Sequence, residues 1–358
     1  MTVINVSDKF QLFPDDLKTF DKLPKGTYVV RFNKMEGFSL TKRDDLKVDE
    51  KMYGHHKAKA QKALKTFDAF ERSLGIILSG DKGIGKTMFT RYMAEQFVNE
   101  KELPVILVDQ PYFGIADFIS SIKQEAMILF DEFEKVFDKQ NKDVEQQDSL
   151  LGLFDGLSST KHMYVITVND LHRLSSFMQN RTGRFHYHFR FEYPTGDEVR
   201  EYVRDNSQDI DKETIEKIVD FSAKVKVTFD TLRSIVFEIS QGYSFSDAVQ
   251  DLNISRGENT KYVVTLIDEN GKEHPMRGAQ ELDLFSSEIT ARGTIVSLNG
   301  YYDVRMSNKG IETLPLGGFA LSNIEPLEVY DDEGDEKYLN ISRVVLTPRA
   351  ETSIKYTV

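Results

Sequence analysis

The chain has 358 residues, 40% of them hydrophobic and 29% charged, which is enough for roughly two to three domains of about 150 residues. Its 46 basic and 58 acidic residues give a net charge of −12, which disfavours general binding to duplex nucleic acid. It contains no cysteine, which excludes disulfides, thiolate metal sites and cysteine nucleophiles. No apolar run approaches the ~20 residues of a membrane helix, and the first residues, MTVINVSDKF, lack the basic and apolar regions of a secretion signal. We therefore expect a soluble, cytoplasmic protein without a membrane partner.

Residues 1–50 are expected to form a short N-terminal segment that contains one β-hairpin. Residues 27–33 and 38–42 are the two strands, and they are separated by Met35-Glu36-Gly37. Polar connectors make up most of the remaining segment.

Residues 51–195 alternate helical and strand patterns. An amphipathic helix is predicted over residues 57–73. The predicted strands are residues 75–79, 104–109, 126–130, 164–168 and 186–191. Strands that alternate with helices indicate an α/β domain, with a parallel sheet covered by helices on both faces. The last strand alternates polar and aromatic residues, so we place it at the edge of the sheet.

The remaining chain divides into two parts. Residues 196–255 show only helical spacings of apolar residues and predict a small all-helical domain. Residues 256–358 form short β-rich runs with the turn dipeptides Asn270-Gly271 and Asn299-Gly300, and they predict a C-terminal β-rich domain.

A phosphate-binding loop follows the strand at residues 75–79. Its residues are Gly80, Asp81, Lys82, Gly83, Ile84, Gly85, Lys86 and Thr87. The glycines allow backbone N–H groups to point at phosphates, and the following helix adds positive potential. Lys86 is expected to contact the β- and γ-phosphates of ATP, and the Thr87 hydroxyl to ligate Mg²⁺.

Two carboxylates follow the apolar strand at residues 126–130. Asp131 and Glu132 lie where ligands bind open α/β sheets, at the carboxyl end of a strand. We expect Asp131 to hold Mg²⁺ and Glu132 to act as the general base for the attacking water.

These motifs, with three further ones, resemble the AAA branch of the AAA+ ATPases. The further motifs are Leu150-Leu151-Gly152-Leu153-Phe154-Asp155-Gly156, Val165-Ile166-Thr167-Val168-Asn169-Asp170 and Asn180-Arg181-Thr182-Gly183-Arg184-Phe185. The resemblance covers about residues 50–250 and makes residues 51–195 the P-loop domain and residues 196–255 its helical lid. Parts of the sequence also resemble AAA ATPases that tailed bacteriophages encode. This resemblance would place the protein in the cytoplasm of a bacterial host.

The resemblance implies roles for individual residues. Asn169 would orient the lytic water, and Arg184, with Arg181 as its partner, would reach the nucleotide of a neighbouring subunit. Tyr53 and Gly54 stand where the family contacts adenine. Arg233 is either a lid arginine that senses the nucleotide or a surface charge. A trans arginine requires a closed head-to-tail ring, which the family forms as a hexamer.

The leading hypothesis is a ring-forming, Mg²⁺- and ATP-dependent hydrolase that remodels or translocates a macromolecule. The acidic balance favours protein as its substrate. One alternative is a nucleic-acid motor or a loader of replication proteins, which needs a basic surface. Another is an ATP-assembled structural or regulatory ring with slow turnover. Tyr112-Phe113-Gly114 has the composition of a loop that grips substrate, but we favour packing of Tyr112 and Phe113 into the core.

Overall fold

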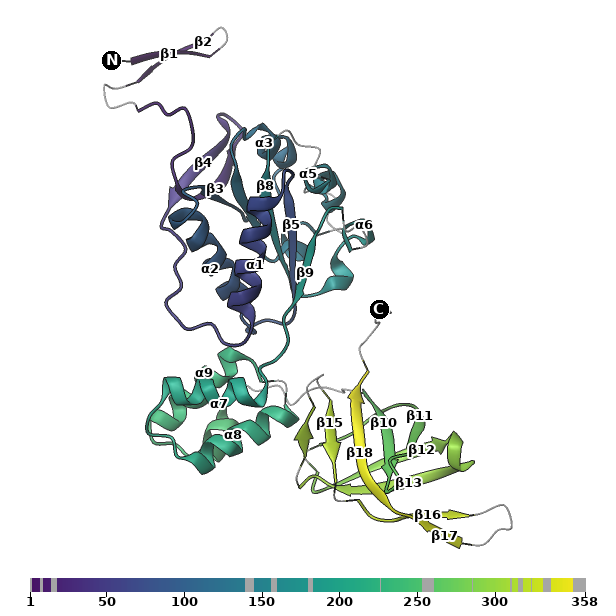
Figure 1. Cartoon of the computed structure of the whole chain (residues 1–358). Coiled ribbons are helices and arrows are strands. Elements are labelled where there is room, and N and C mark those ends of the chain that lie inside the picture. The colour runs from purple at the N-terminus through teal and green to yellow at the C-terminus, as the bar shows by residue number, and fades with distance from the viewer. Residues whose placement is uncertain are drawn as a thin grey trace. The chain divides into compact units, whose positions relative to one another are not determined.

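The computed structural model describes most of the chain as two compact units, residues 1–192 and 193–358 (Figure 1). The described ranges are residues 2–6, 9–13, 18–138, 145–155, 160–179, 183–225, 227–252, 261–284, 286–309, 311–314, 318–322, 324–330 and 336–349. In these ranges, no helix combines the length and the apolar character that a membrane crossing requires.

A seven-stranded sheet organises the first unit, with the strand order β4-β3-β6-β7-β8-β5-β9. The strands are β3 (Gly26–Asn33), β4 (Gly37–Arg43), β5 (Leu74–Ser79), β6 (Pro104–Val108), β7 (Ala126–Phe130), β8 (His162–Val168) and β9 (Tyr187–Arg190). Every pairing is parallel except that between β3 and β4. The predicted parallel sheet is therefore confirmed, and β9 lies at its edge as expected.

Helices cover both faces of this sheet. The helices are α1 (His56–Ala69), α2 (Lys86–Asn99), α3 (Ile115–Ser121), α4 (Phe133–Val136), α5 (Leu151–Phe154) and α6 (Ser176–Gln179), with 3₁₀ turns η1 (Gln147–Leu150) and η2 (Leu171–Arg173). Ile77 of β5 joins the core that contains residues of α3, α5 and α6. Figure 1 shows α1 and α2 in front of the sheet, where the ring centroids of Phe67 and Phe97 lie 5.3 Å apart. Strands β5, β7 and β8 are buried along their whole length because both faces are covered.

The N-terminal hairpin belongs to the same sheet. We expected residues 1–50 to form a separate segment, but β3 pairs in parallel with β6, so that Gly26 lies opposite Pro104. A second hairpin precedes it, formed by β1 (Thr2–Val6) and β2 (Lys9–Phe13). The expected boundary at residue 51 therefore does not separate the β3–β4 hairpin from the α/β sheet.

The first helix is shorter than predicted. α1 ends at Ala69, not at residue 73, because Phe70 adopts an extended conformation. The chain needs this turn, since β5 begins only four residues later at Leu74.

The second unit begins with a helical part, as predicted, which has four helices in the described residues. They are α7 (Gly196–Asn206), α8 (Lys212–Lys224), α9 (Phe229–Ser240) and α10 (Phe245–Asp251). A side-chain oxygen caps the N-terminus of each helix by accepting a backbone N–H hydrogen bond; the caps are Thr195, Asp211, Thr228 and Ser244. Three apolar residues of α7 and three of α9 point inward and are buried.

The rest of the second unit is β-rich, as predicted. A seven-stranded sheet has the order β13-β12-β11-β10-β18-β15-β14, and β16 pairs with β17. The strands are β10 (Lys261–Asp268), β11 (Glu273–Glu281), β12 (Glu288–Ile295), β13 (Gly300–Ser307), β14 (Glu312–Thr313), β15 (Phe319–Leu321), β16 (Leu327–Tyr330), β17 (Glu336–Leu339) and β18 (Ile341–Pro348), with the 3₁₀ turn η3 (Val296–Leu298). Gly271, with φ +78°, turns β10 into β11, which confirms the first turn dipeptide.

Candidate functional site

Three neighbouring strands deliver the predicted chemical groups to one edge of the sheet. β7, β8 and β5 are adjacent and parallel, so their carboxyl ends lie side by side. Asp131 and Glu132 follow β7, Asn169 follows β8, and the loop of residues 80–85 follows β5. The order of the strands therefore brings the predicted loop, carboxylates and amide together, in the position where open α/β sheets bind ligands.

The loop has the backbone conformation of a phosphate cradle. Gly80, Gly83 and Gly85 all have positive φ angles, of +144°, +76° and +101°. A Cβ atom on Gly80 would lie 2.5 Å from the carbonyl oxygen of Phe191, so no other residue fits there. The loop leads directly into α2, whose first N–H groups attract anions.

Lys86, the first residue of α2, connects the loop with Asn169. Its Nζ donates to the carbonyl oxygens of Gly80 at 2.6 Å and Asp81 at 2.7 Å, and to Asn169 Oδ1 at 2.9 Å. The side chain is buried, and burial lowers the pKa of Lys86, while four nearby carboxylates oppose this shift. The ammonium group is thus held at the point where the phosphate loop meets the carboxyl end of β8.

Thr167 positions both acidic residues that follow β7. Its hydroxyl donates to Asp131 Oδ1 at 2.6 Å and accepts the backbone N–H of Glu132 at 2.8 Å. Glu132 has the left-handed conformation, with φ +47°, which is unfavourable for a residue with a side chain. Backbone strain of this kind is concentrated at functional sites, and here it turns Glu132 away from the strand direction.

The Glu132 carboxylate is held in its ionised form. Oε1 accepts from Lys135 Nζ at 2.7 Å and Asn169 Nδ2 at 3.2 Å, and Lys82 Nζ lies 3.7 Å away. These contacts, the Lys135 hydrogen bond above all, lower the pKa of Glu132. An ionised carboxylate can accept a proton from water, which is what the general-base role requires.

The oxygen groups at this edge fit Mg²⁺. Thr87 presents an exposed hydroxyl at the start of α2, and Asp131 presents a carboxylate that Thr167 orients. In the ranges given above, no group of three or more His, Cys, Asp or Glu side chains gathers as a metal site. One carboxylate and one hydroxyl suit Mg²⁺, which takes its other ligands from water and nucleotide phosphates.

Tyr112 and Phe113 occupy different environments. Tyr112 is half-buried, and its ring centroid lies 5.8 Å from that of Phe32 and 6.2 Å from that of Phe38, both in the β3–β4 hairpin. Phe113 is 61% exposed. The expected core packing is therefore right for Tyr112 and wrong for Phe113.

Four of the remaining predicted site residues are Tyr53, Gly54, Arg181 and Arg233. Tyr53 is buried, and Gly54 follows it with φ +67°. Arg233 lies on α9 in the second unit, 3.8 Å from Asp230. Arg181 falls outside the residues that the structure describes.

Arg184 is bound within its own chain. Its Nε and Nη2 donate to the two Asp155 carboxylate oxygens, the latter at 3.0 Å, and Nη1 donates to the Phe177 carbonyl oxygen at 2.8 Å. The side chain is only 8% exposed. Arg184, which we expected to point at a neighbouring subunit, is thus a buried partner of Asp155, and it could reach a neighbour only after that pair opens.

Replacing Arg184 with alanine is expected to lower the free energy of unfolding by about 1–3 kcal/mol, because the Asp155 carboxylate loses two hydrogen bonds from a buried guanidinium group. Urea unfolding measures the change. Arg91→Ala, which removes an exposed arginine of α2, should stay within about 0.5 kcal/mol of the wild type. Unchanged stability of Arg184→Ala combined with lost ATPase activity would instead show that Arg184 is free to act on a neighbour.

Glu134 is a buried carboxylate of the site that the sequence analysis missed. It is 1% exposed and accepts hydrogen bonds from Asn169. A glutamate beside Lys135 looks like an ordinary solvated charge in the sequence. The sequence does contain one indication of this burial. Glu134 comes two residues after Glu132, in a run that continues with apolar residues.

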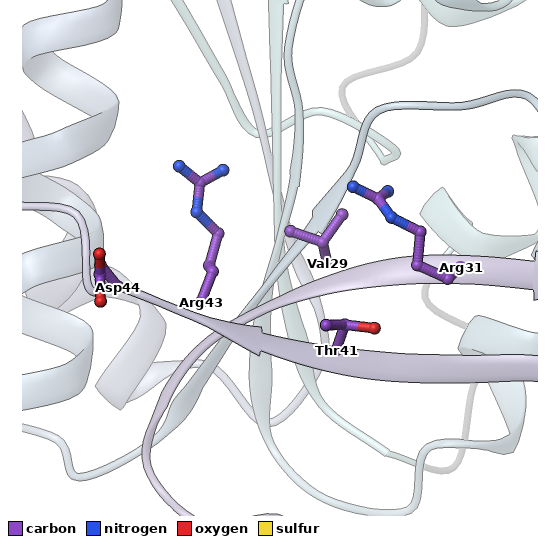
Figure 2. Close-up of a pocket in the computed structure, with 5 residues that line it drawn as sticks. All are labelled: Val29, Arg31, Thr41, Arg43 and Asp44. Atoms are coloured by element: carbon purple, nitrogen blue, oxygen red, sulfur yellow. The ribbon is translucent and has the colours of Figure 1, made fainter.

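A second concave surface lies on the β3–β4 ribbon, at the lateral edge of the sheet that is opposite β9. It encloses about 310 Å³ and is lined by Val29, Arg31, Thr41, Arg43 and Asp44. Figure 2 shows both guanidinium groups on the same side of the ribbon, with Val29 between them. Arg31 also contacts Asp109 at 2.8 Å, so the surface is only partly basic.

Comparison with known proteins gives one family match. Residues 76–193 match the sequence model of AAA, the ATPase family associated with various cellular activities. A search of curated proteins found no match. Two structures of RuvB from Thermotoga maritima, the second a mutant, are similar to this chain. The first, titled a Holliday junction branch migration motor, is 18% identical in sequence and has a TM-score of 0.40. The second is 16% identical in sequence and has a TM-score of 0.43. The alignments cover 52% and 56% of this chain, and 61% and 70% of those chains, which is too distant a likeness to indicate a substrate.

Proposed function

We propose that this chain assembles into a closed head-to-tail ring, a hexamer as the family resemblance implies, and uses Mg²⁺ and ATP to remodel or translocate a protein. The match of residues 76–193 to the AAA ATPase family supports this proposal. The observation that supports this most is the hydrogen-bonded connection from Lys86 through Asn169 to Glu132. It joins the phosphate-binding lysine to the proposed general base.

The geometry supports in-line hydrolysis of the terminal phosphate. Lys86 exchanges its carbonyl partners for phosphate oxygens when ATP enters the loop. Glu132 takes the proton of the attacking water, and Asn169 holds that water in line. Thr87 and Asp131 would hold Mg²⁺, which would supply positive charge to the phosphate oxygens when bound.

Coupling between subunits would use the arginines after α6. Charge spreads over the phosphoryl oxygens during transfer, and a guanidinium from a neighbouring subunit stabilises it. Arg181 and Arg184 are the proposed pair. Opening of the Arg184–Asp155 contact would then accompany docking of the neighbour, which links assembly to hydrolysis.

Exposed apolar side chains favour a protein substrate. β3 and β6 are parallel, so the loops after their carboxyl ends lie at the same end of the sheet. These loops carry Met35, which is 94% exposed, and Phe113, which is 61% exposed. Large exposed apolar side chains in loops can bind unfolded polypeptide. The net charge of −12 is compatible with a polypeptide substrate.

Replacing Phe113 with alanine is expected to abolish stimulation of the ATPase by an unfolded model protein such as casein, because the loop loses its apolar contact. Basal ATPase activity should stay within about twofold, since Phe113 does not touch the phosphate loop. Phe20→Ala, which removes another exposed phenylalanine of the same unit, is the matched control. Equal stimulation of wild type and Phe113→Ala would contradict the proposed grip.

A nucleic-acid motor is the second candidate, and the surface in Figure 2 favours it. Arg31 and Arg43 could contact successive phosphates, and Thr41 lines the same surface with a hydroxyl. Single-stranded DNA that stimulates the ATPase, with an effect that falls as salt rises and is lost in Arg43→Ala, would favour this candidate over the protein motor.

A further inference from the structure

We propose that Glu134 is a positioning residue that fixes the orientation of the Asn169 side chain during hydrolysis. This inference rests on the proposed roles of Asn169 and Glu132 in activating water. Glu134 is the second residue of α4, directly after the strained turn at Glu132.

Glu134 holds Asn169 at two points. Its Oε1 accepts the backbone N–H of Asn169 at 3.1 Å and the side-chain Nδ2 at 3.2 Å. Two hydrogen bonds to one residue fix both its main chain and its amide plane. Asn169 therefore cannot rotate its amide without losing a bond to a buried carboxylate.

The burial of Glu134 has no evident benefit for stability. The side chain is 1% exposed, and its Oε2 is buried without a hydrogen-bond partner. A buried carboxylate with an unsatisfied oxygen is costly, and an apolar side chain of similar volume would commonly be no less stable. A costly group at the edge of a reaction site calls for a functional explanation, and its contacts with Asn169 provide one.

The network suggests what this positioning achieves. In the structure, Asn169 Oδ1 accepts from Lys86, while Nδ2 is shared by Glu132 and Glu134. When phosphate oxygens take over Lys86, Oδ1 loses its donor, but Glu134 still holds Nδ2. Oδ1 then stays directed at the reaction site and accepts one hydrogen of the attacking water, while Glu132 accepts the other.

The test compares Glu134→Ala, Glu134→Gln, Asn169→Ala and the Glu134→Ala/Asn169→Ala double variant. Glu134→Ala should lower kcat about 10- to 100-fold, the scale of a small misplacement of a catalytic group, with the KM for ATP changed less than about threefold. Glu134→Gln retains an acceptor oxygen and should restore kcat to within about fivefold of the wild type. The double variant should be no slower than Asn169→Ala alone, because both substitutions remove the same interaction.

Glu71→Ala, which removes an exposed carboxylate of the same unit, is the matched control and should leave kcat unchanged. If Glu134→Ala does not fold, Glu134→Met replaces it, because methionine fills a similar volume. Additive losses in the double variant, or a loss in Glu134→Gln as large as in Glu134→Ala, would overturn the inference.

A second readout does not depend on turnover. The side-chain amide resonance of Asn169 in ¹⁵N NMR spectra should shift or broaden in Glu134→Ala and return in Glu134→Gln. An inactive wild type with this pattern would refute the proposed function and leave the contact intact. An Asn169 resonance that does not respond to Glu134 would refute the positioning role, whatever the activity.

Discussion

Replacing Glu132 with glutamine is expected to lower kcat for ATP hydrolysis by about 100- to 10,000-fold, the usual contribution of a general base. Glutamine keeps the size of the side chain and can still accept from Lys135 and Asn169, but it cannot take a proton from water. ATP binding should persist, because Glu132 does not belong to the phosphate loop. Steady-state hydrolysis gives kcat, and titration with a fluorescent ATP analogue gives Kd.

The same variant separates the motor from an ATP-assembled ring with slow turnover. A matched substitution, Glu71→Gln, should leave both kcat and Kd unchanged. If the wild type hydrolyses ATP no faster than Glu132→Gln while ATP still assembles the protein, the slow-turnover ring is favoured. If Glu132→Gln keeps more than a tenth of the wild-type kcat, Glu132 is not the base.

Replacing Lys86 with alanine is expected to weaken ATP binding at least about 100-fold, because two charge-assisted contacts with phosphates, at about 1.5–3 kcal/mol each, are lost. The substitution also leaves the Gly80 and Asp81 carbonyl oxygens without their present donor. Isothermal titration with ATP measures the affinity, and circular dichroism verifies the fold.

The control for this effect is Lys65→Ala, which removes an exposed lysine of α1. It should bind ATP within about twofold of the wild type, because the side chain lies outside the phosphate loop. Binding by Lys86→Ala that is as tight as that of the control would show that Lys86 does not contact the phosphates.

Local sequence patterns predicted where the phosphate loop and the two carboxylates lie in the sheet. The phosphate loop, Asp131 and Glu132 each follow an apolar strand, and spacing along the chain alone assigns them to strand ends. The alternation in residues 186–191 placed β9 at the edge because the central strands of a parallel sheet that is covered on both faces are buried along their length. These features depend on residues that are close in sequence.

The features that sequence missed depend on contacts between distant residues. The pairing of β3 with β6 joins residues almost 80 positions apart, and no local pattern encodes such a partner. The contact of Arg184 with Asp155 spans 29 positions and converts a presumed exposed finger into a buried ion pair. From the sequence alone, Glu134 is indistinguishable from a surface charge. In the structure it is buried against Asn169.

The most direct test of the account is the specific ATPase activity as a function of protein concentration, measured together with the assembly state by mass photometry. A ring whose active site is completed by a neighbour should gain specific activity as subunits assemble, and the rise should coincide with the appearance of closed oligomers. Constant specific activity down to concentrations at which only monomers are present would contradict the shared-site ring.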